Sequence, residues 1–181
     1  MIQHLIETIR GWEFIKIGTF YCCKKPFEYS EKVEGVKKTI TYEHPAALRL
    51  IDDYFLKASE SAYVLKIDNE IKYVGEYSST LQDRWLRRRK DTTEWLSWHS
   101  DNLDNKITSA LKDSNEKSEI SLWLTVNPFL DGPNGPINIS KAIEQDFLLS
   151  DEPLPFNKKG NNKNRTGLKV QNILNSIIPK T

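Results

Sequence analysis

Five side chains of types suited to chemistry on a phosphate ester are spread over the chain: Tyr63, Tyr73, Arg84, Glu144 and Asn157. Cleaving a phosphodiester bond requires a deprotonated water, positive charge to neutralise the transition state, and help for the leaving oxygen. Phenol, guanidinium and carboxylate groups can meet such needs when they share one site. Their order and spacing therefore decide whether these residues can act together.

Short motifs surround all five residues. They are Ala62-Tyr63-Val64, Tyr73-Val74-Gly75, Leu81 with Arg84, Glu144, and Pro155-Phe156-Asn157. Taken singly, each has an ordinary explanation, because tyrosines are common in strands, charged side chains on solvated helix faces and asparagines in loops. Only their joint occurrence in this order argues for a functional site.

The order and spacing of the motifs resemble the GIY-YIG nuclease family over residues 62–157. The resemblance implies a small antiparallel sheet of three strands flanked by helices. It further implies that Tyr63 is the general base or orients the attacking water, that Tyr73 supports it or the phosphate, and that Arg84 supplies charge to the scissile phosphate. Glu144 would then be the protein ligand of a divalent metal, Mg²⁺ or Mn²⁺, while the amide of Asn157 orders the site.

Two positions depart from the family pattern. Ala62 stands where the family usually has glycine, and Glu76 follows Gly75 where lysine or histidine is common. An acid beside a phosphate is unfavourable unless it binds metal or pairs with an arginine. Arg87 or Arg88, one turn beyond Arg84 on the helix expected there, could substitute for the missing cation.

The two tyrosines must share one face of a hairpin if they are to act together. Residues 62–68 and 71–75 read as strands joined by a turn at Asp68-Asn69-Glu70. A three-residue loop places Tyr63 and Tyr73 on one face and Lys66 and Lys72 on the other, whereas a two-residue loop separates the tyrosines. The need to keep both tyrosines on one face therefore favours the three-residue loop.

Helices and one further strand should carry the remaining residues. Ser79 with Gln82 forms a capping box, which predicts a helix with Arg84, Arg87 and Arg88 on one basic face. A second helix is expected over residues 103–111 and a half-buried strand over 119–127. Ser140 can cap a further helix that runs to about Leu149 and carries Glu144. The apolar spacing of residues 170–178 predicts a C-terminal amphipathic helix.

The first 60 residues contain no motif. Apolar spacing suggests a short helix near residues 5–9 and another over 48–55, with a strand over 12–21 that could pair with residues 38–42. We expect an α+β fold in which residues 1–60 are an extension that could recognise DNA, residues 61–158 the catalytic core with an insertion around 86–139, and residues 159–181 a basic stretch and helix.

Bulk charge gives no argument for nucleic-acid binding, because 26 basic residues face 25 acidic ones. Two basic clusters could nevertheless bind phosphate, although a run of charges taken singly is more often a solvated helix face. Their members are Arg87, Arg88, Arg89, Lys90, Lys158, Lys159, Lys163 and Arg165. The two adjacent cysteines and three scattered histidines do not suggest a zinc site, and the N-terminus lacks a secretory pattern, which predicts a cytoplasmic protein.

The resemblance thus implies a divalent-metal-dependent endonuclease of double-stranded DNA. A stand-alone type II restriction endonuclease is expected, because 181 residues leave no room for the large domains that accompany the module in repair and homing enzymes. Cutting both strands would suit a homodimer or higher homo-oligomer. Two alternatives stay open: a catalytically silent nucleic-acid-binding module, and a toxin, effector or phage nuclease.

Overall fold

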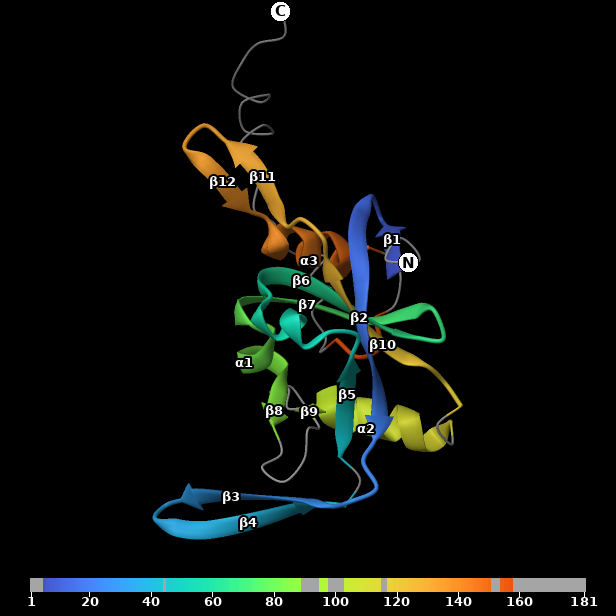
Figure 1. Cartoon of the computed structure of the whole chain (residues 1–181), viewed down its shortest axis with the longest axis vertical. Helices are drawn as coiled ribbons and strands as arrows, with labels where there is room; N and C mark the ends of the chain where they lie inside the picture. The colour runs from blue at the N-terminus through green and yellow to red at the C-terminus, as the bar shows by residue number, and fades with distance from the viewer. Residues whose placement is uncertain are drawn as a thin grey trace, which may run out of the picture.

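The computed structural model describes residues 5–43, 45–88, 95–97, 103–114, 117–150 and 154–157. One large antiparallel sheet runs through it (Figure 1). Its strands lie in the order β7-β6-β10-β2-β5-β9-β8, with β1 paired to β2. Their bounds are β1 Ile6–Ile9, β2 Trp12–Cys22, β5 Ala46–Leu50, β6 Ser59–Ile67, β7 Glu70–Thr80, β8 Leu86–Arg88, β9 Trp95–Ser97 and β10 Ile120–Thr125.

The expected α+β fold with a small three-stranded sheet flanked by helices is therefore wrong. The described residues form a mostly β fold around one large curled sheet. Strands β7, β6 and β10 lie next to one another, but β2 pairs with the other edge of β10 and carries the sheet onward. An unpaired strand edge is a template for further strands, and residues assigned to an extension and an insertion supply them.

Three local expectations for the first 60 residues are also wrong. The segment near residues 5–9 is strand β1, and the segment over 48–55 is divided between β5 and the 3₁₀ helix η2 (Asp53–Lys57). Strand β4 (Val36–Tyr42) pairs with β3 (Phe27–Val33) instead of with β2. Local apolar spacing cannot distinguish a short helix from a strand, and pairing with β2 decides in favour of strands.

The sheet is covered on both faces near β10. Side chains of β6 alternate between two apolar clusters, so that Tyr63 and Leu65 belong to one and Ala62 and Val64 to the other. Helix α2 (Leu103–Asp113) packs in the first cluster and helix α3 (Ser140–Leu148) in the second. The N-cap of α3 is Ile139, so the expected capping by Ser140 is wrong. All six residues of β10 are buried as a result, which corrects the expected half-buried strand.

The β6–β7 hairpin places Tyr63 and Tyr73 on one face, as expected, but through a different turn. Its turn has two residues, Asp68 and Asn69, both with positive φ (48° and 71°), and not the three expected. The register then shifts at Lys72, because Leu65 pairs with Tyr73 while Lys66 pairs with Ile71. A two-residue turn alone would place the two tyrosines on opposite faces of the hairpin. The one-residue bulge shifts the side-chain alternation by one position, so both tyrosines face the same cluster.

Helix α1 (Leu81–Trp85) is a single turn that begins one residue later than expected. Its N-cap is Thr80, whose hydroxyl accepts from the Asp83 amide at 3.2 Å, and not Ser79. The chain leaves the helix at Leu86 and enters β8, which pairs with β9. The predicted helical face of Arg84, Arg87 and Arg88 is therefore wrong, because the last two residues belong to a strand.

Several predicted residues lie outside the described part. They are Arg89, Lys90, Lys158, Lys159, Lys163 and Arg165, together with the C-terminal helix. Two hairpins project from the sheet in Figure 1: β3–β4, and β11 (Phe129–Gly132) with β12 (Gly135–Asn138). Among the helices that the structure describes, none has the length and apolar character needed to cross a membrane.

Candidate active site at the edge of the sheet

Tyr63 is fully buried within a cage of aromatic rings. Its ring stacks with that of Tyr73 at a centroid distance of 5.8 Å and lies 5.9 Å from that of Tyr77. Trp85, from the single turn of α1, meets it edge-on at 5.2 Å. Offset and edge-to-face contacts of this kind are the preferred geometries of aromatic pairs. The cage therefore holds the Tyr63 phenol in one orientation.

Gly75 provides the space for that phenol. It lies directly opposite Tyr63 in the β6–β7 register. A Cβ added at Gly75 would lie 2.5 Å from Tyr63 Cζ and closer still to the hydroxyl oxygen. The phenol thus lies across the backbone of β7, the last strand of the described sheet. A side chain at residue 75 would occupy the position of the phenol.

Arg84 connects the phenol with the acidic part of the site. Burial raises the pKa of Tyr63 well above its ordinary value, and the neighbouring Tyr73 raises it further. Arg84 opposes this shift in pKa through its charge and through a hydrogen bond to Tyr63. Desolvation outweighs the arginine, so Tyr63 is a neutral phenol at ordinary pH.

Glu144 extends from α3, which packs on β6 and β7. Burial raises the pKa of its half-buried carboxyl, and the charge of Glu76 on β7 raises it further, while Lys141 and Arg84 act in the opposite direction. Arg84 therefore interacts with both Tyr63 and Glu144. The Glu144 carboxyl therefore experiences the charge of one acidic and two basic side chains.

The Asn157 side chain forms hydrogen bonds with the backbone of the edge strand β7. Its Oδ1 accepts from the Val74 amide at 3.1 Å, and its Nδ2 donates to the Val74 carbonyl at 2.8 Å. The Phe156 amide also donates to the carbonyl of Lys72 at 2.9 Å. Lys106 of α2 holds this segment by donating to the Phe156 carbonyl at 2.6 Å. The Asn157 amide therefore supports the backbone between Tyr73 and Gly75.

The structure stacks the Tyr73 ring on that of Tyr63 and joins the Asn157 amide to the backbone of Val74. The charge of Arg84 influences the pKa of both Tyr63 and Glu144. That the five residues form one active site stays a prediction. The side chains of Arg87 and Arg88 are not described, so the substitution suggested for Glu76 stays a prediction. Sequence reasoning missed Tyr77, Trp85 and Lys106. Tyr77 could have been found, because residues 73, 75 and 77 are two positions apart in a strand and therefore lie on the same face. Nothing local marked Lys106, whose contact lies 50 positions away.

No family model, curated protein or solved structure matches the chain significantly. Within the described residues, no group of three or more histidine, cysteine, aspartate or glutamate side chains could hold a metal ion. A metal here would rest on the Glu144 and Glu76 carboxylates and on water.

We predict that Asn157→Asp destabilises the protein by about 1–3 kcal/mol, because an aspartate cannot donate to the Val74 carbonyl. Asn127→Asp is the matched control. The Oδ1 of Asn127 accepts from the Phe129 amide at 3.2 Å, and a carboxylate can do the same, so its effect should stay within about 0.5 kcal/mol. Chemical denaturation of both variants measures the difference. Equal destabilisation would show that the Nδ2 hydrogen bond of Asn157 contributes nothing.

Gly75→Ala should lower the free energy of unfolding by about 1–3 kcal/mol, because the methyl group would overlap the Tyr63 phenol in a packed cage. In a Tyr63→Leu background the overlapping atoms are absent, so the same change should be less damaging. A double-mutant cycle by denaturant unfolding gives this coupling. Additive effects would mean that the close approach of residues 63 and 75 does not determine the stability.

Without divalent metal, Glu144→Gln should raise the melting temperature at neutral pH. Folding raises the pKa of Glu144, so the folded state binds this proton more tightly than the unfolded chain, and the ionised carboxylate opposes folding. The advantage of glutamine should shrink as the pH falls through the raised pKa. Thermal unfolding in a chelator as a function of pH tests this, with Asp146→Asn on the same helix as control. A lower melting temperature for Glu144→Gln alone would contradict it.

Proposed function

We propose that this chain is a divalent-metal-dependent endonuclease that hydrolyses phosphodiester bonds of double-stranded DNA. The observation that supports this most strongly is the position of Arg84, which interacts with both the buried Tyr63 phenol and the Glu144 carboxyl. Tyr73 and Asn157 join the same edge of the sheet. These residue types in this order also form the pattern that resembles the GIY-YIG nucleases.

Arg84 would bind the scissile phosphate. Its guanidinium is charged at every relevant pH and can offer two parallel donors to phosphate oxygens. Such fixed charge stabilises the transition state more than the ground state when it is aimed at oxygens that gain negative charge. The short helix α1, capped by Thr80 and anchored by buried Leu81 and Trp85, presents Arg84 on a rigid support.

Tyr63 would orient the attacking water as a neutral phenol. Its raised pKa argues against a resident phenolate, so the hydroxyl acts through hydrogen bonds. The aromatic cage permits little movement of the ring, which keeps the hydroxyl beside Arg84 and therefore beside the phosphate. Tyr73, stacked on Tyr63, extends the same hydrogen-bonding group.

Glu144 and Glu76 suit a hard divalent cation such as Mg²⁺ or Mn²⁺, because carboxylate and water oxygens are the ligands these ions prefer. Their mutual repulsion, which helps to raise the pKa of Glu144, would be relieved by a cation between them. A bound metal supplies Lewis acidity toward phosphate and lowers the pKa of its water. On this proposal, Glu76 takes part in metal binding where the family pattern commonly has a base.

A type II restriction endonuclease is the biological role that we propose. Such an enzyme must cut both strands of a duplex, which a homodimer with two equivalent sites achieves. The additional strands and projecting hairpins around the core offer surface for sequence recognition. The DNA sequence recognised is open.

The decisive test compares cleavage and binding of duplex DNA by matched variants. Glu144→Gln and Tyr63→Phe should each lower cleavage with Mg²⁺ or Mn²⁺ by about a hundredfold or more. Duplex affinity should survive, and it should improve for Glu144→Gln because one negative charge is removed. Asp146→Asn on the same helix and Tyr54→Phe on the surface are the controls and should cut normally.

The other outcomes separate the alternatives. Binding without cleavage by the wild-type protein, over varied duplexes and both metals, would favour a silent nucleic-acid-binding module. Full cleavage by both Glu144→Gln and Tyr63→Phe would place the chemistry elsewhere in the chain.

A further inference from the structure

Strand β6 departs from regular geometry at Glu60. The register of β6 and β7 shifts between Ser59 and Ser61, so the regular ladder is interrupted at this residue. Glu60 has a φ of 52°, in the left-handed region that residues other than glycine rarely adopt. Backbone of this kind persists only where its surroundings hold it in place. Contacts from outside the β6–β7 ladder are therefore needed at Glu60.

Two side chains bind the carbonyl of Glu60 where β12 leads into α3 (Figure 1). The Nδ2 of Asn138, the last residue of β12, donates to that carbonyl at 2.7 Å. The hydroxyl of Ser140, the first residue of α3 and almost fully buried, donates to it at 2.7 Å as well. These contacts join residues that are 78 and 80 positions apart. We call Glu60, Asn138 and Ser140 the clamp.

Asn138 also supplies the side-chain acceptor that the first turn of α3 otherwise lacks. The N-cap residue, Ile139, makes no side-chain hydrogen bond. The Oδ1 of Asn138 accepts from the Ser140 amide at 2.9 Å and lies 2.6 Å from the Ser140 hydroxyl. That hydroxyl has one proton, so the Asn138 oxygen and the Glu60 carbonyl share it. The clamp thus ties the first turn of α3 to β6.

The clamp lies one helical turn from Glu144. Ser140 and Glu144 are four positions apart, so they lie on the same side of α3, about 6 Å from each other along its axis. Farther along the helix, Ile143 and Phe147 are buried in the apolar cluster on this face of the sheet. Apolar burial is not directional, whereas hydrogen bonds require defined distances and angles. The clamp therefore gives the start of α3 a defined place on β6.

We infer that Asn138 and Ser140 are positioning residues of the proposed nuclease. By binding the Glu60 carbonyl they fix the first turn of α3 on the strand that carries Tyr63, and so determine where Glu144 stands relative to that strand. This inference rests on the proposed function, in which Glu144 binds a divalent metal. Replacing groups that orient a metal ligand without touching the metal typically lowers metal affinity or activity by about ten- to a hundredfold.

Two substitutions open the clamp while α3 keeps its acceptor. Asn138→Asp loses the donor to Glu60 but keeps an oxygen for the amide of residue 140. Ser140→Ala loses the hydroxyl and gains helix propensity. The double variant leaves the Glu60 carbonyl without both donors. Glu60→Gly keeps that carbonyl and adopts positive φ readily, so the clamp should stay closed in this control.

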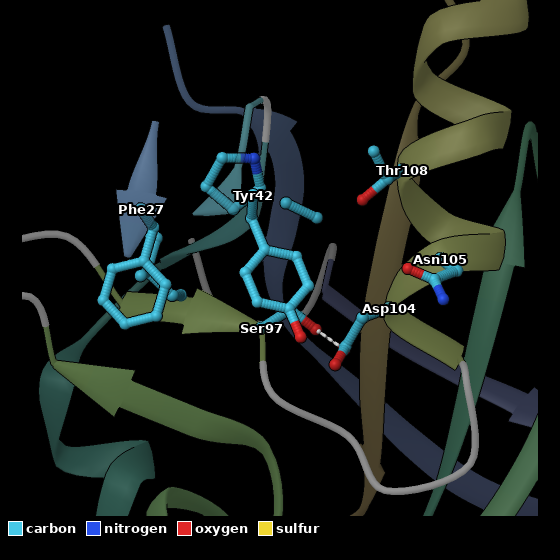
Figure 2. Close-up of a pocket in the computed structure, with 9 residues that line it drawn as sticks. Phe27, Tyr42, Ser97, Asp104, Asn105 and Thr108 are labelled. Atoms are coloured by element: carbon cyan, nitrogen blue, oxygen red, sulfur yellow. Dashed lines mark hydrogen bonds between the residues drawn. The ribbon is translucent and has the colours of Figure 1, made fainter. Parts of the chain in front are cut away.

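A buried serine that ties α2 to the sheet is the matched control for Ser140. Ser97 of β9 donates its hydroxyl to Asp104, in the first turn of α2, at 2.6 Å. Figure 2 shows this bond beside a hollow that Phe27 and Tyr42 line. Helix α2 carries none of the five candidate site residues. Ser97→Ala should therefore lower stability without changing metal affinity.

Mn²⁺ binding by the whole chain, followed from the electron paramagnetic resonance signal of the free ion, gives a readout that does not depend on cleavage. The double variant should bind Mn²⁺ about tenfold or more weakly than the wild type. Ser97→Ala and Glu60→Gly should bind it as the wild type does. Circular dichroism and denaturant unfolding show which variants are folded at the assay temperature. If the double variant is unfolded, Ser140→Ala alone takes its place and should lose affinity in the same direction.

Cleavage of duplex DNA gives the second readout. The double variant should need about tenfold more Mn²⁺ than the wild type for half-maximal cleavage. In a Glu144→Gln background, opening the clamp should cause no further loss of cleavage, because the clamp acts through Glu144. An equal loss in both backgrounds would show that the clamp acts elsewhere and would overturn the inference.

The remaining outcomes separate this inference from the proposed function. Equal Mn²⁺ affinity of the wild type and the double variant would overturn the inference, and so would an equal loss for Ser97→Ala, which would show that affinity follows stability alone. A wild type that cuts DNA, with a double variant that cuts equally well at every Mn²⁺ concentration, keeps the nuclease proposal and refutes the clamp. A wild type that binds Mn²⁺ in a clamp-dependent way but never cuts does the reverse. A wild type that neither binds Mn²⁺ nor cuts refutes both.

Discussion

The close approach of the Tyr63 phenol to the backbone of Gly75 is the constraint on which the rest of the site depends. A glycine must stand opposite Tyr63, the tyrosines must share one face, and β7 must hold its position under the ring. The two-residue turn with its bulge at Lys72 satisfies the second condition. The Asn157 amide, bound to both polar groups of Val74, satisfies the third. The β6–β7 hairpin and the distant Asn157 thus together maintain one close approach.

The electrostatic surroundings of the Tyr63 phenol differ from those of the Glu144 carboxyl. The phenol is buried deeply enough to stay neutral, while the Glu144 carboxyl experiences the charges of both Glu76 and Arg84. Burying charge without full compensation opposes folding. The ionised Glu144 carboxylate therefore opposes folding. The raised pKa of Glu144 is the physical sign of this conflict.

The large sheet gives the site a rigid support. Strands β6 and β7 belong to a continuous ladder that reaches β8, and α2 and α3 cover opposite faces of it. Helix α2 also reaches the site directly, because Lys106 holds the segment that carries Asn157. The strands outside β6, β7 and β10 therefore brace the edge at which the residues gather. The β3–β4 hairpin projects from this body.

The sequence by itself determined much of the local structure around the five candidate residues, whose joint role stays a prediction. The strands expected over 62–68 and 71–75 and the helices expected over 103–111 and near 140–149 agree with the structure to within a few residues, because such features follow from short-range periodicity and turn chemistry. Only the tertiary structure decided that Ile6–Ile9 and Ala46–Leu50 are strands, that α1 ends after one turn, and that a bulge sets the tyrosine faces. Each of these outcomes depends on which strands pair, and the free energy of pairing comes from partners far away in the chain. No local window of sequence contains that information.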